Sequence, residues 1–352
     1  MRLRPLGGTG ALVSEFCLGS MTFGQESDEP EAHRMLDVFA EAGGTFIDTA
    51  DAYAQGAAEE MIGRWLARHR NREDFVIATK VRFRMGDRPN EVGLSRRWIR
   101  HEVENSLRRL QIDYIDLYQA HCWDPLTPLE ETLSAFDELV QAGTIRYVGL
   151  SNFAGWQLQK AVLLTRLNGW APVVTLQPQY NLLAREIEWE AVPVCLEERV
   201  GLLTWSPLGG GWLTGKYRPD ERPTGVTRLG EDPERGVEAY DKRNTERTWR
   251  ILDVVARIAD ERGGVSQAQV ALNWLLRQPA VTSVTSVMLG ARNVAQLEDN
   301  LGTTNWELSD EELSQLDDVS DLGLPYPYGF IEDATHGRID GVSREAVSST
   351  SP

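Results

Sequence analysis

Basic residues are scarce in this chain. Its 352 residues include 36 Lys plus Arg against 53 Asp plus Glu, which gives a formal net charge of −17 at pH 7. A field of this sign repels phosphate backbones and anionic lipid headgroups, and the sequence has no basic cluster that would offset it. The composition therefore argues against nucleic-acid and membrane partners and leaves small molecules as the expected ligands.

Cysteines and long apolar runs are also rare. Cys17, Cys122 and Cys195 are odd in number and widely spaced, which excludes a disulfide framework, and neither they nor the five histidines have metal-ligand spacing. No stretch approaches the ~18 apolar residues of a membrane span. The segment up to Glu15 lacks the apolar run of a secretion signal. We expect a cytoplasmic protein with reduced thiols and no metal site.

Short β-rich runs alternate with amphipathic helical segments along the chain, as in βα units that build a parallel sheet. The runs cover residues 16–18, 46–47, 75–79, 115–120, 145–150, 173–176, 202–205 and 284–289. Among the helices, Ser95 and Ser309 are expected N-caps, and Thr127 to Glu130 reads as a capping box with Pro128 in the first helical position.

A polar residue or glycine follows each of these runs. From the second run onward these residues are Asp48, Lys80, His121, Ser151, Gln177, Ser206 and Gly290. In a closed barrel all strand ends converge on one site, whereas in an open sheet only those near the switch point do. We therefore predict a (β/α)8 barrel with an N-terminal β-hairpin, a long loop after the seventh strand and a C-terminal loop or helix.

The predicted barrel forms one domain over residues 1–335. Residues 210–245 interrupt it with a stretch rich in Gly, Pro, Arg and acidic residues that shows no hydrophobic period. This insertion is too long for an ordinary connection, so we predict a lid or a mobile loop. Residues 336–352 read as a flexible tail.

Four residues near three successive strand ends form a candidate catalytic set: Asp48, Tyr53, Lys80 and His121. Reduction of a carbonyl leaves negative charge on oxygen and needs a proton donor, for which Tyr53 is suited if the Lys80 ammonium lowers its pKa. Asp48 would hold Lys80 charged, and His121 would orient the substrate oxygen. A Schiff-base aldolase that uses Lys80 is a weaker alternative, because Asp48 should keep that lysine protonated.

Several ordered motifs make the chain resemble the aldo-keto reductases over residues 1–320. They are FIDTADAY at 46–53, ATK at 78–80, DYIDLYQAH at 113–121, GLSNF at 149–153, QPQYN at 177–181, WSPLGGGWLTG at 205–215 and LGARNVAQLEDN at 289–300. The resemblance implies a (β/α)8 barrel that binds NADP(H) without a Rossmann domain, with NAD(H) as the alternative cofactor, and it matches all four catalytic residues. The chain is most similar to bacterial members related to potassium-channel β-subunits, because Trp205 takes the nicotinamide-stacking position.

The resemblance also implies the cofactor contacts, of which Ser151, Asn152 and Gln177 have the amide and hydroxyl groups that suit a nicotinamide carboxamide. Arg292 suits a 2′-phosphate. The full set is Gly19, Met21, Asp48, Ser151, Asn152, Gln177, Trp205, Ser206, Pro207, Leu208, Gly209, Gly211, Lys216, Gly290, Arg292, Gln296 and Asn300.

Aromatic side chains near the expected barrel mouth are candidates for the substrate pocket: Phe23, Phe83, Trp123, Tyr326 and Tyr328. The leading hypothesis is an NADP(H)-dependent oxidoreductase that interconverts a carbonyl and an alcohol. The alternative is a nucleotide-sensing subunit with little turnover. The sequence indicates neither the substrate nor the oligomeric state.

Overall fold

A computed structural model of the chain describes residues 1–70, 72–219, 221–225, 227–232, 234, 236–278 and 286–339. Its contacts divide the chain into two units, Met1–Ser320 and Asp321–Pro352. The second unit contains helix α14, Tyr328–Ile339, in the place of the expected C-terminal loop or helix. Of the predicted tail, residues 336–339 belong to α14, and residues 340–352 lie outside the described residues. The single domain predicted over residues 1–335 stays a prediction.

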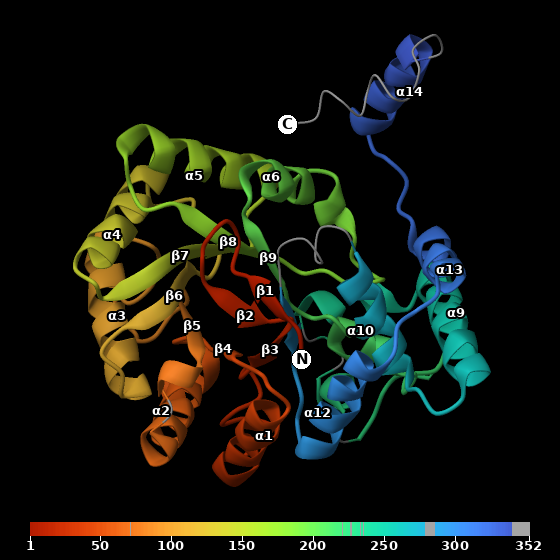
Figure 1. Ribbon diagram of the computed structural model, residues 1–352, viewed down its shortest axis with the longest axis horizontal. Helices are drawn as coiled ribbons and strands as arrows, with labels where there is room; N and C mark the ends of the chain where they lie inside the picture. The colour runs from red at the N-terminus through yellow and green to blue at the C-terminus, as the bar shows by residue number, and fades with distance from the viewer. Residues whose placement is uncertain are drawn as a thin grey trace. The chain divides into compact units, whose positions relative to one another are not determined.

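Eight parallel strands close into a barrel in the order β10, β3, β4, β5, β6, β7, β8, β9. Figure 1 shows them at the centre of the first unit, with the helices around them. The strands are β3 (Phe16–Gly19), β4 (Phe46–Asp48), β5 (Val76–Val81), β6 (Ile115–Ala120), β7 (Ile145–Ser151), β8 (Val173–Gln177), β9 (Gly201–Thr204) and β10 (Ser286–Leu289). The predicted barrel is confirmed. Residues 284 and 285 of the predicted last strand lie outside the described residues.

The predicted N-terminal hairpin is also present. Strands β1 (Leu3–Pro5) and β2 (Leu12–Ser14) pair antiparallel outside the barrel sheet. Leu6 and Val13 of the hairpin segment are buried in one cluster with barrel residues that include Cys17 and Phe46. The hairpin therefore adds apolar side chains to a second core, separate from the main one beneath the helices.

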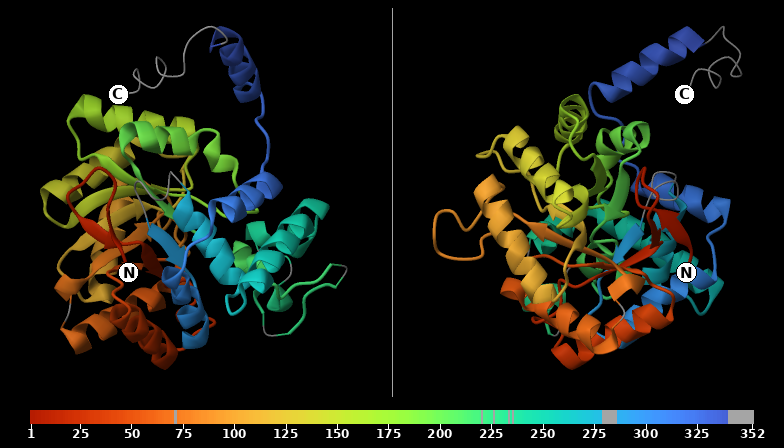
Figure 2. Two further views of the ribbon diagram at one scale, coloured as in Figure 1. Left: turned by 45° about the vertical axis from the view of Figure 1, so that its right-hand side comes forward. Right: turned by 60° about the vertical axis from the view of Figure 1, so that its left-hand side comes forward.

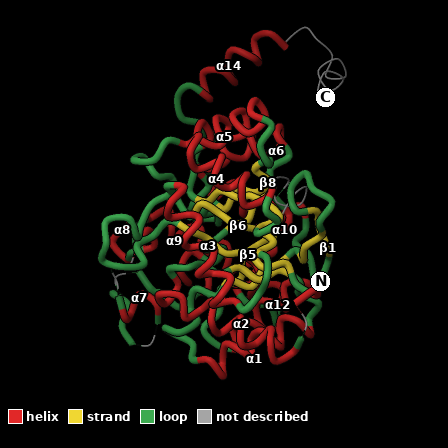
Figure 3. Tube along the Cα trace, turned by 90° about the vertical axis from the view of Figure 1, so that its left-hand side faces the viewer, coloured by secondary structure: helices red, strands yellow, loops and turns green. Residues whose placement is uncertain are grey.

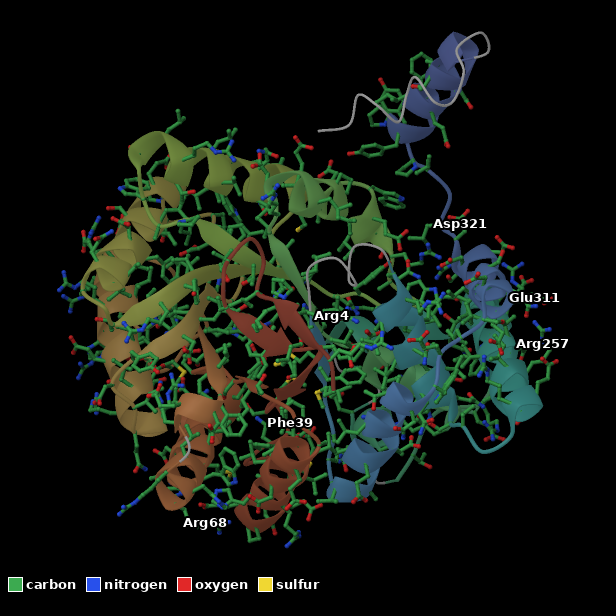
Figure 4. The ribbon with its side chains drawn as sticks, viewed as in Figure 1. Arg4, Phe39, Arg68, Arg257, Glu311 and Asp321 are labelled. Carbon is green, nitrogen blue, oxygen red and sulfur yellow. The ribbon has the colours of Figure 1, made fainter. Side chains whose placement is uncertain are left out.

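Helices surround the strands, as the tube view shows (Figure 3). The longer helices of the first unit are α1 (Glu29–Glu41), α2 (Ala57–His69), α3 (Arg96–Leu110), α4 (Leu129–Gln141), α5 (Gly155–Asn168), α6 (Ala191–Glu198), α9 (Glu246–Arg262), α10 (Gln267–Arg277), α12 (Val294–Leu301) and α13 (Asp310–Ser320). Single 3-10 turns are η2 (Arg72–Asp74), η3 (Glu186–Glu188) and η6 (Gly302–Asn305). Phe39 of α1 is fully buried, whereas Arg68 of α2 lies on the outer surface (Figure 4).

The N-caps show where local sequence decides a helix start. The Ser95 hydroxyl accepts from the Trp98 amide, and Ser309 and Glu312 exchange backbone and side-chain hydrogen bonds, so both predictions are confirmed. The prediction of a capping box at Thr127 is wrong. The Thr127 hydroxyl donates to Asp124 at 2.7 Å, and Pro128 takes the cap position through its carbonyl oxygen.

The insertion after β9 has its own short helices: η4 (Gly209–Thr214), α7 (Arg228–Glu231), η5 (Gly236–Glu238) and α8 (Tyr240–Arg243). Its first element, η4, packs against α9 and α10 (Figure 2). Trp212 is fully buried, stacks on Tyr240 and meets Tyr217 and Trp249 edge to face. Aromatic side chains without helical spacing therefore anchor a segment in which the sequence shows no hydrophobic period.

None of the helices within the described ranges combines the length and the hydropathy that crossing a membrane requires.

Candidate active site

The four predicted catalytic side chains meet at the C-terminal end of the barrel. Asp48 ends β4, Lys80 is the penultimate residue of β5, and His121 directly follows β6. Tyr53 begins the 3-10 turn η1, Tyr53–Gly56. Parallel barrel strands direct these ends to a single face, so residues far apart in the sequence become neighbours. Asp48 and Lys80 are fully buried, so little solvent screens their charges.

The Lys80 ammonium uses its hydrogens on three acceptors. Its Nζ donates to the Asp48 carboxylate, to the Thr49 carbonyl oxygen at 2.8 Å and to Tyr53 Oη at 3.2 Å. Burial by itself lowers the pKa of Lys80, but Asp48 and Tyr53 together raise it to about 12. Lys80 is therefore an ammonium at neutral pH and a poor nucleophile, which argues against the Schiff-base alternative.

Two glutamine amides hold the other oxygen of the Asp48 carboxylate. The Nε2 atoms of Gln119 and Gln177 donate to Asp48 Oδ1 at 3.1 and 2.9 Å. Gln119 is absent from the sequence-based site. The sequence could have indicated Gln119, because it lies two residues before His121. Side chains two residues apart in a strand point to the same face, and a glutamine is unusual in a mainly apolar strand. These bonds fix the carboxylate that faces Lys80.

The pKa of Tyr53 shifts in the direction opposite to the one expected from the sequence. Burial of its ring raises its pKa above the ordinary value of 10, and this effect outweighs the opposing influence of the nearby Lys80 ammonium. The sequence-based reasoning considered only the ammonium and predicted a lowered pKa. The Tyr53 hydroxyl is consequently protonated at neutral pH, which is the state that a proton donor requires.

A buried ionic cluster supports the turn that carries Tyr53. The turn continues through Ala54, Gln55 and Gly56, all with positive φ, and a Cβ on Gly56 would lie 2.6 Å from the side chain of Arg109. Arg109 pairs with Glu59 and Glu102, and Glu59 also accepts from Thr79, the residue before Lys80. None of these contacts was predicted from the sequence. They connect α2 and α3 to the strand that presents the ammonium.

His121 lies beside Tyr53, with ring centroids 5.8 Å apart and nearly perpendicular planes. The Phe83 ring also meets the imidazole edge to face, with centroids 4.6 Å apart. Burial, reinforced by Lys80 and Arg82, holds the pKa of His121 well below its ordinary value. Its Nδ1 has no hydrogen-bond partner among the described residues. A neutral imidazole next to the tyrosine hydroxyl can donate one hydrogen bond to a substrate oxygen.

The residues predicted to face a nicotinamide form a continuous network. Asn152 donates through Nδ2 to the His121 carbonyl oxygen at 2.9 Å and to Ser151 Oγ at 3.0 Å. Its Oδ1 accepts from Trp205 Nε1 at 3.1 Å. The Ser151 hydroxyl donates to the Gln177 carbonyl oxygen at 2.8 Å. The His121 backbone and the Trp205 indole are therefore linked through one amide.

The predicted pyrophosphate segment turns sharply after β9. Ser206, Gly209, Gly210 and Gly211 all have positive φ. The Ser206 hydroxyl donates to Glu238 Oε1 at 3.0 Å and accepts from the Gly210 amide at 3.2 Å. Glu238 comes from the insertion, and no local pattern in the sequence indicated it.

Other predicted cofactor residues adjoin this turn or lie at the barrel rim. A Cβ on Gly211 would lie 2.4 Å from Lys216 Nζ, so the ammonium sits beside the turn. Pro207 is buried and Leu208 half-buried in the same segment. Gly19 ends β3, where an added Cβ would lie 2.9 Å from Met288, and Met21 follows half-buried.

The predicted adenosine residues lie just before α12 and on it. Gly290 is exposed, with open space where a Cβ would lie. The Arg292 amide donates to Gln296 Oε1 at 3.0 Å, and Asn300 is buried on the same helix. The Arg292 guanidinium pairs with Glu231 of α7, a partner that the sequence did not indicate.

The predicted pocket aromatics have different environments. Phe23 is fully buried and packs in the main core. Phe83 is partly exposed beside His121. Trp123 is half-buried against Phe153. Tyr326 and Tyr328 belong to the second unit.

Comparison with known proteins assigns the family. The sequence pattern of the aldo/keto reductase family matches residues 15–321. The uncharacterized oxidoreductase YrpG of Bacillus subtilis (strain 168) is 37% identical over 323 residues, which cover 89% of this chain and 94% of YrpG. Norsolorinic acid reductase stcV of Emericella nidulans is 32% identical over 345 residues, 94% of this chain and 83% of the relative.

A third relative carries a different name. A probable voltage-gated potassium channel subunit beta of Arabidopsis thaliana is 36% identical over 311 residues, which cover 86% of this chain and 90% of the relative. The barrel and the family match make this protein an oxidoreductase of the (β/α)8 class. It belongs to the aldo/keto reductase family.

Proposed function

We propose that this protein is an NADP(H)-dependent oxidoreductase that interconverts carbonyl compounds and alcohols. The observation that carries the proposal is the geometry of Lys80, whose ammonium contacts the Asp48 carboxylate and the Tyr53 hydroxyl at once. An ammonium placed there stabilises negative charge on the tyrosine oxygen after the proton has left. This is the property that a general acid for a developing alkoxide needs.

Each side chain of the site has a separate role in carbonyl reduction. A bound nicotinamide would supply the hydride. Tyr53 Oη donates its proton to the substrate oxygen as charge develops there, while Lys80 stabilises the resulting phenolate. Neutral His121 donates a hydrogen bond that orients the same oxygen. In the oxidation direction the phenolate takes the proton back.

The residues around the C-terminal end of the barrel suit a dinucleotide. Asn152, Ser151 and Gln177 would hold the carboxamide and Trp205 the flat face of the nicotinamide, with the turn from Ser206 to Gly211 near the phosphates and Arg292 at the adenosine end. The Ser206 hydroxyl donates a hydrogen bond to the Glu238 carboxylate, and the Arg292 guanidinium donates to the Glu231 carboxylate. Donors that hold carboxylates in this way are chemically suited to the oxyanions of a phosphorylated cofactor.

Arg292→Ala tests the choice of cofactor. A charge-assisted bond between guanidinium and phosphate contributes about 1.5–3 kcal/mol, so the variant should bind NADPH roughly ten- to a hundredfold more weakly, with little change for NADH. Dissociation constants from calorimetric titration of cofactor-free protein measure this. Equal weakening of both cofactors would contradict the assignment of Arg292 to the 2′-phosphate.

A nucleotide-sensing subunit is the second candidate, favoured by the similarity to the plant protein named as a channel subunit. The two functions differ in turnover. An oxidoreductase consumes NADPH absorbance with a panel of aldehydes, ketones and sugars, or produces it from the corresponding alcohols. A sensing subunit binds NADPH and shows little turnover with any member of the panel.

We also propose that Phe83 and Trp123 line the substrate pocket. The centroid of the Phe83 ring lies 4.6 Å from that of His121, and Trp123 follows His121 by two residues.

A further inference from the structure

The insertion places a carboxylate on the arginine that would recognise the cofactor. Arg292 Nη2 donates to both Oε1 and Oε2 of Glu231, each at 2.9 Å. The two residues are 61 positions apart in the chain and meet only because α7 comes near the start of α12. The pair is partly shielded, since 21% of the Arg292 side chain and 43% of the Glu231 side chain are exposed.

A carboxylate on this guanidinium opposes a phosphate there. Both groups are oxyanions that accept from the same N–H donors, and two such anions on one guanidinium repel each other. A 2′-phosphate that binds Arg292 must therefore separate Glu231 from it. A ribose without this phosphate presents a hydroxyl, which can donate to a carboxylate instead of repelling it.

We propose that Glu231 is a specificity-determining residue of the cofactor site, which competes with the 2′-phosphate for Arg292 and so reduces the preference for phosphorylated cofactor. The inference rests on the proposed NADP(H) function and adds a second residue to that site. Arg292 attracts the phosphate, and Glu231 limits how strongly that attraction favours NADP(H) over NAD(H).

Within the described part of the insertion, α7 holds the Glu231 carboxylate against Arg292. Trp212 anchors the start of the insertion in the core, and the Glu238 carboxylate attaches its later part to Ser206 and Arg243. Glu234 lies in the same segment but pairs with Arg222. Glu234 thus offers a matched control, with the same charge, the same insertion and a different arginine.

The test uses two small probes that differ only in the phosphate of interest. Cofactor-free protein is titrated by calorimetry with 2′,5′-ADP and with 5′-ADP, and the ratio of the two affinities reports the phosphate preference. Glu231→Gln should raise this ratio about three- to tenfold, mainly through tighter 2′,5′-ADP binding. Glu234→Gln should leave the ratio at the wild-type value, although it removes the same charge. NADPH and NADH should show the same trend.

Combination with Arg292→Ala separates the inference from the proposed function. In the Arg292→Ala background, Glu231→Gln should no longer raise the ratio, because the contested donor is gone. Equal ratios for Glu231→Gln and Glu234→Gln, with a ratio that still falls on Arg292→Ala, would overturn the role of Glu231 and leave the NADP(H) assignment intact. A ratio that Arg292→Ala leaves unchanged in both backgrounds would overturn both.

Discussion

Tyr53→Phe should lower the rate of carbonyl reduction by at least about 10²-fold, the usual contribution of a positioned acid, while NADPH binding persists. The substitution removes one hydroxyl and little volume, so the Lys80 ammonium keeps its contacts with Asp48 and Thr49. Single-turnover kinetics with saturating NADPH measure the loss at the chemical step. A rate close to that of the wild-type enzyme would contradict Tyr53 as the proton donor.

The pH profile and a second tyrosine sharpen this prediction. Because burial raises the pKa of Tyr53, reduction by the wild-type enzyme should be insensitive to this group at neutral pH and should slow in alkaline solution as the hydroxyl ionises. The part of the alkaline decline that is due to Tyr53 should vanish in Tyr53→Phe. Tyr118→Phe is the control, since the buried Tyr118 hydroxyl has no partner among the described residues, and this variant should retain both rate and profile.

Lys80→Met should be at least as damaging to turnover. It removes the ammonium that stabilises the Tyr53 phenolate and leaves the buried Asp48 carboxylate without its cation. Breaking a buried ion pair from one side costs about 3–5 kcal/mol of stability, so the melting temperature should fall as well. Thermal unfolding and turnover are measured on the same preparation.

A double variant separates the loss of chemistry from the loss of stability. Asp48→Asn combined with Lys80→Met removes both buried charges, so much of the lost thermal stability should return. Turnover should stay low, because Tyr53 still lacks its cation. Recovery of turnover along with stability would show that Lys80 acts only in folding and would contradict its role beside Tyr53.

The sequence by itself predicted the barrel, two of the three N-caps and the four side chains that meet at the C-terminal end of the barrel. Asp48, Lys80 and His121 were recognisable because each occurs where an apolar run ends, and the ends of parallel strands gather on one face. Ser95 and Ser309 were recognisable because a cap depends on residues within about one turn. The prediction of an N-cap at Thr127 was wrong for an equally local reason, because the Thr127 hydroxyl donates its hydrogen bond to the Asp124 carboxylate instead.

Only the tertiary structure decided which distant side chains pair with one another around the candidate site. Gln177 reaches Asp48 across 129 positions, Arg109 reaches Glu59 across 50 and Arg292 reaches Glu231 across 61. Such pairings depend on the closure of the barrel and on the path of the insertion. Neither of these produces a local periodicity in the sequence from which it could be predicted. The direction of the Tyr53 pKa was decided in the same way, because burial is a property of the packed barrel and here outweighs the neighbouring ammonium.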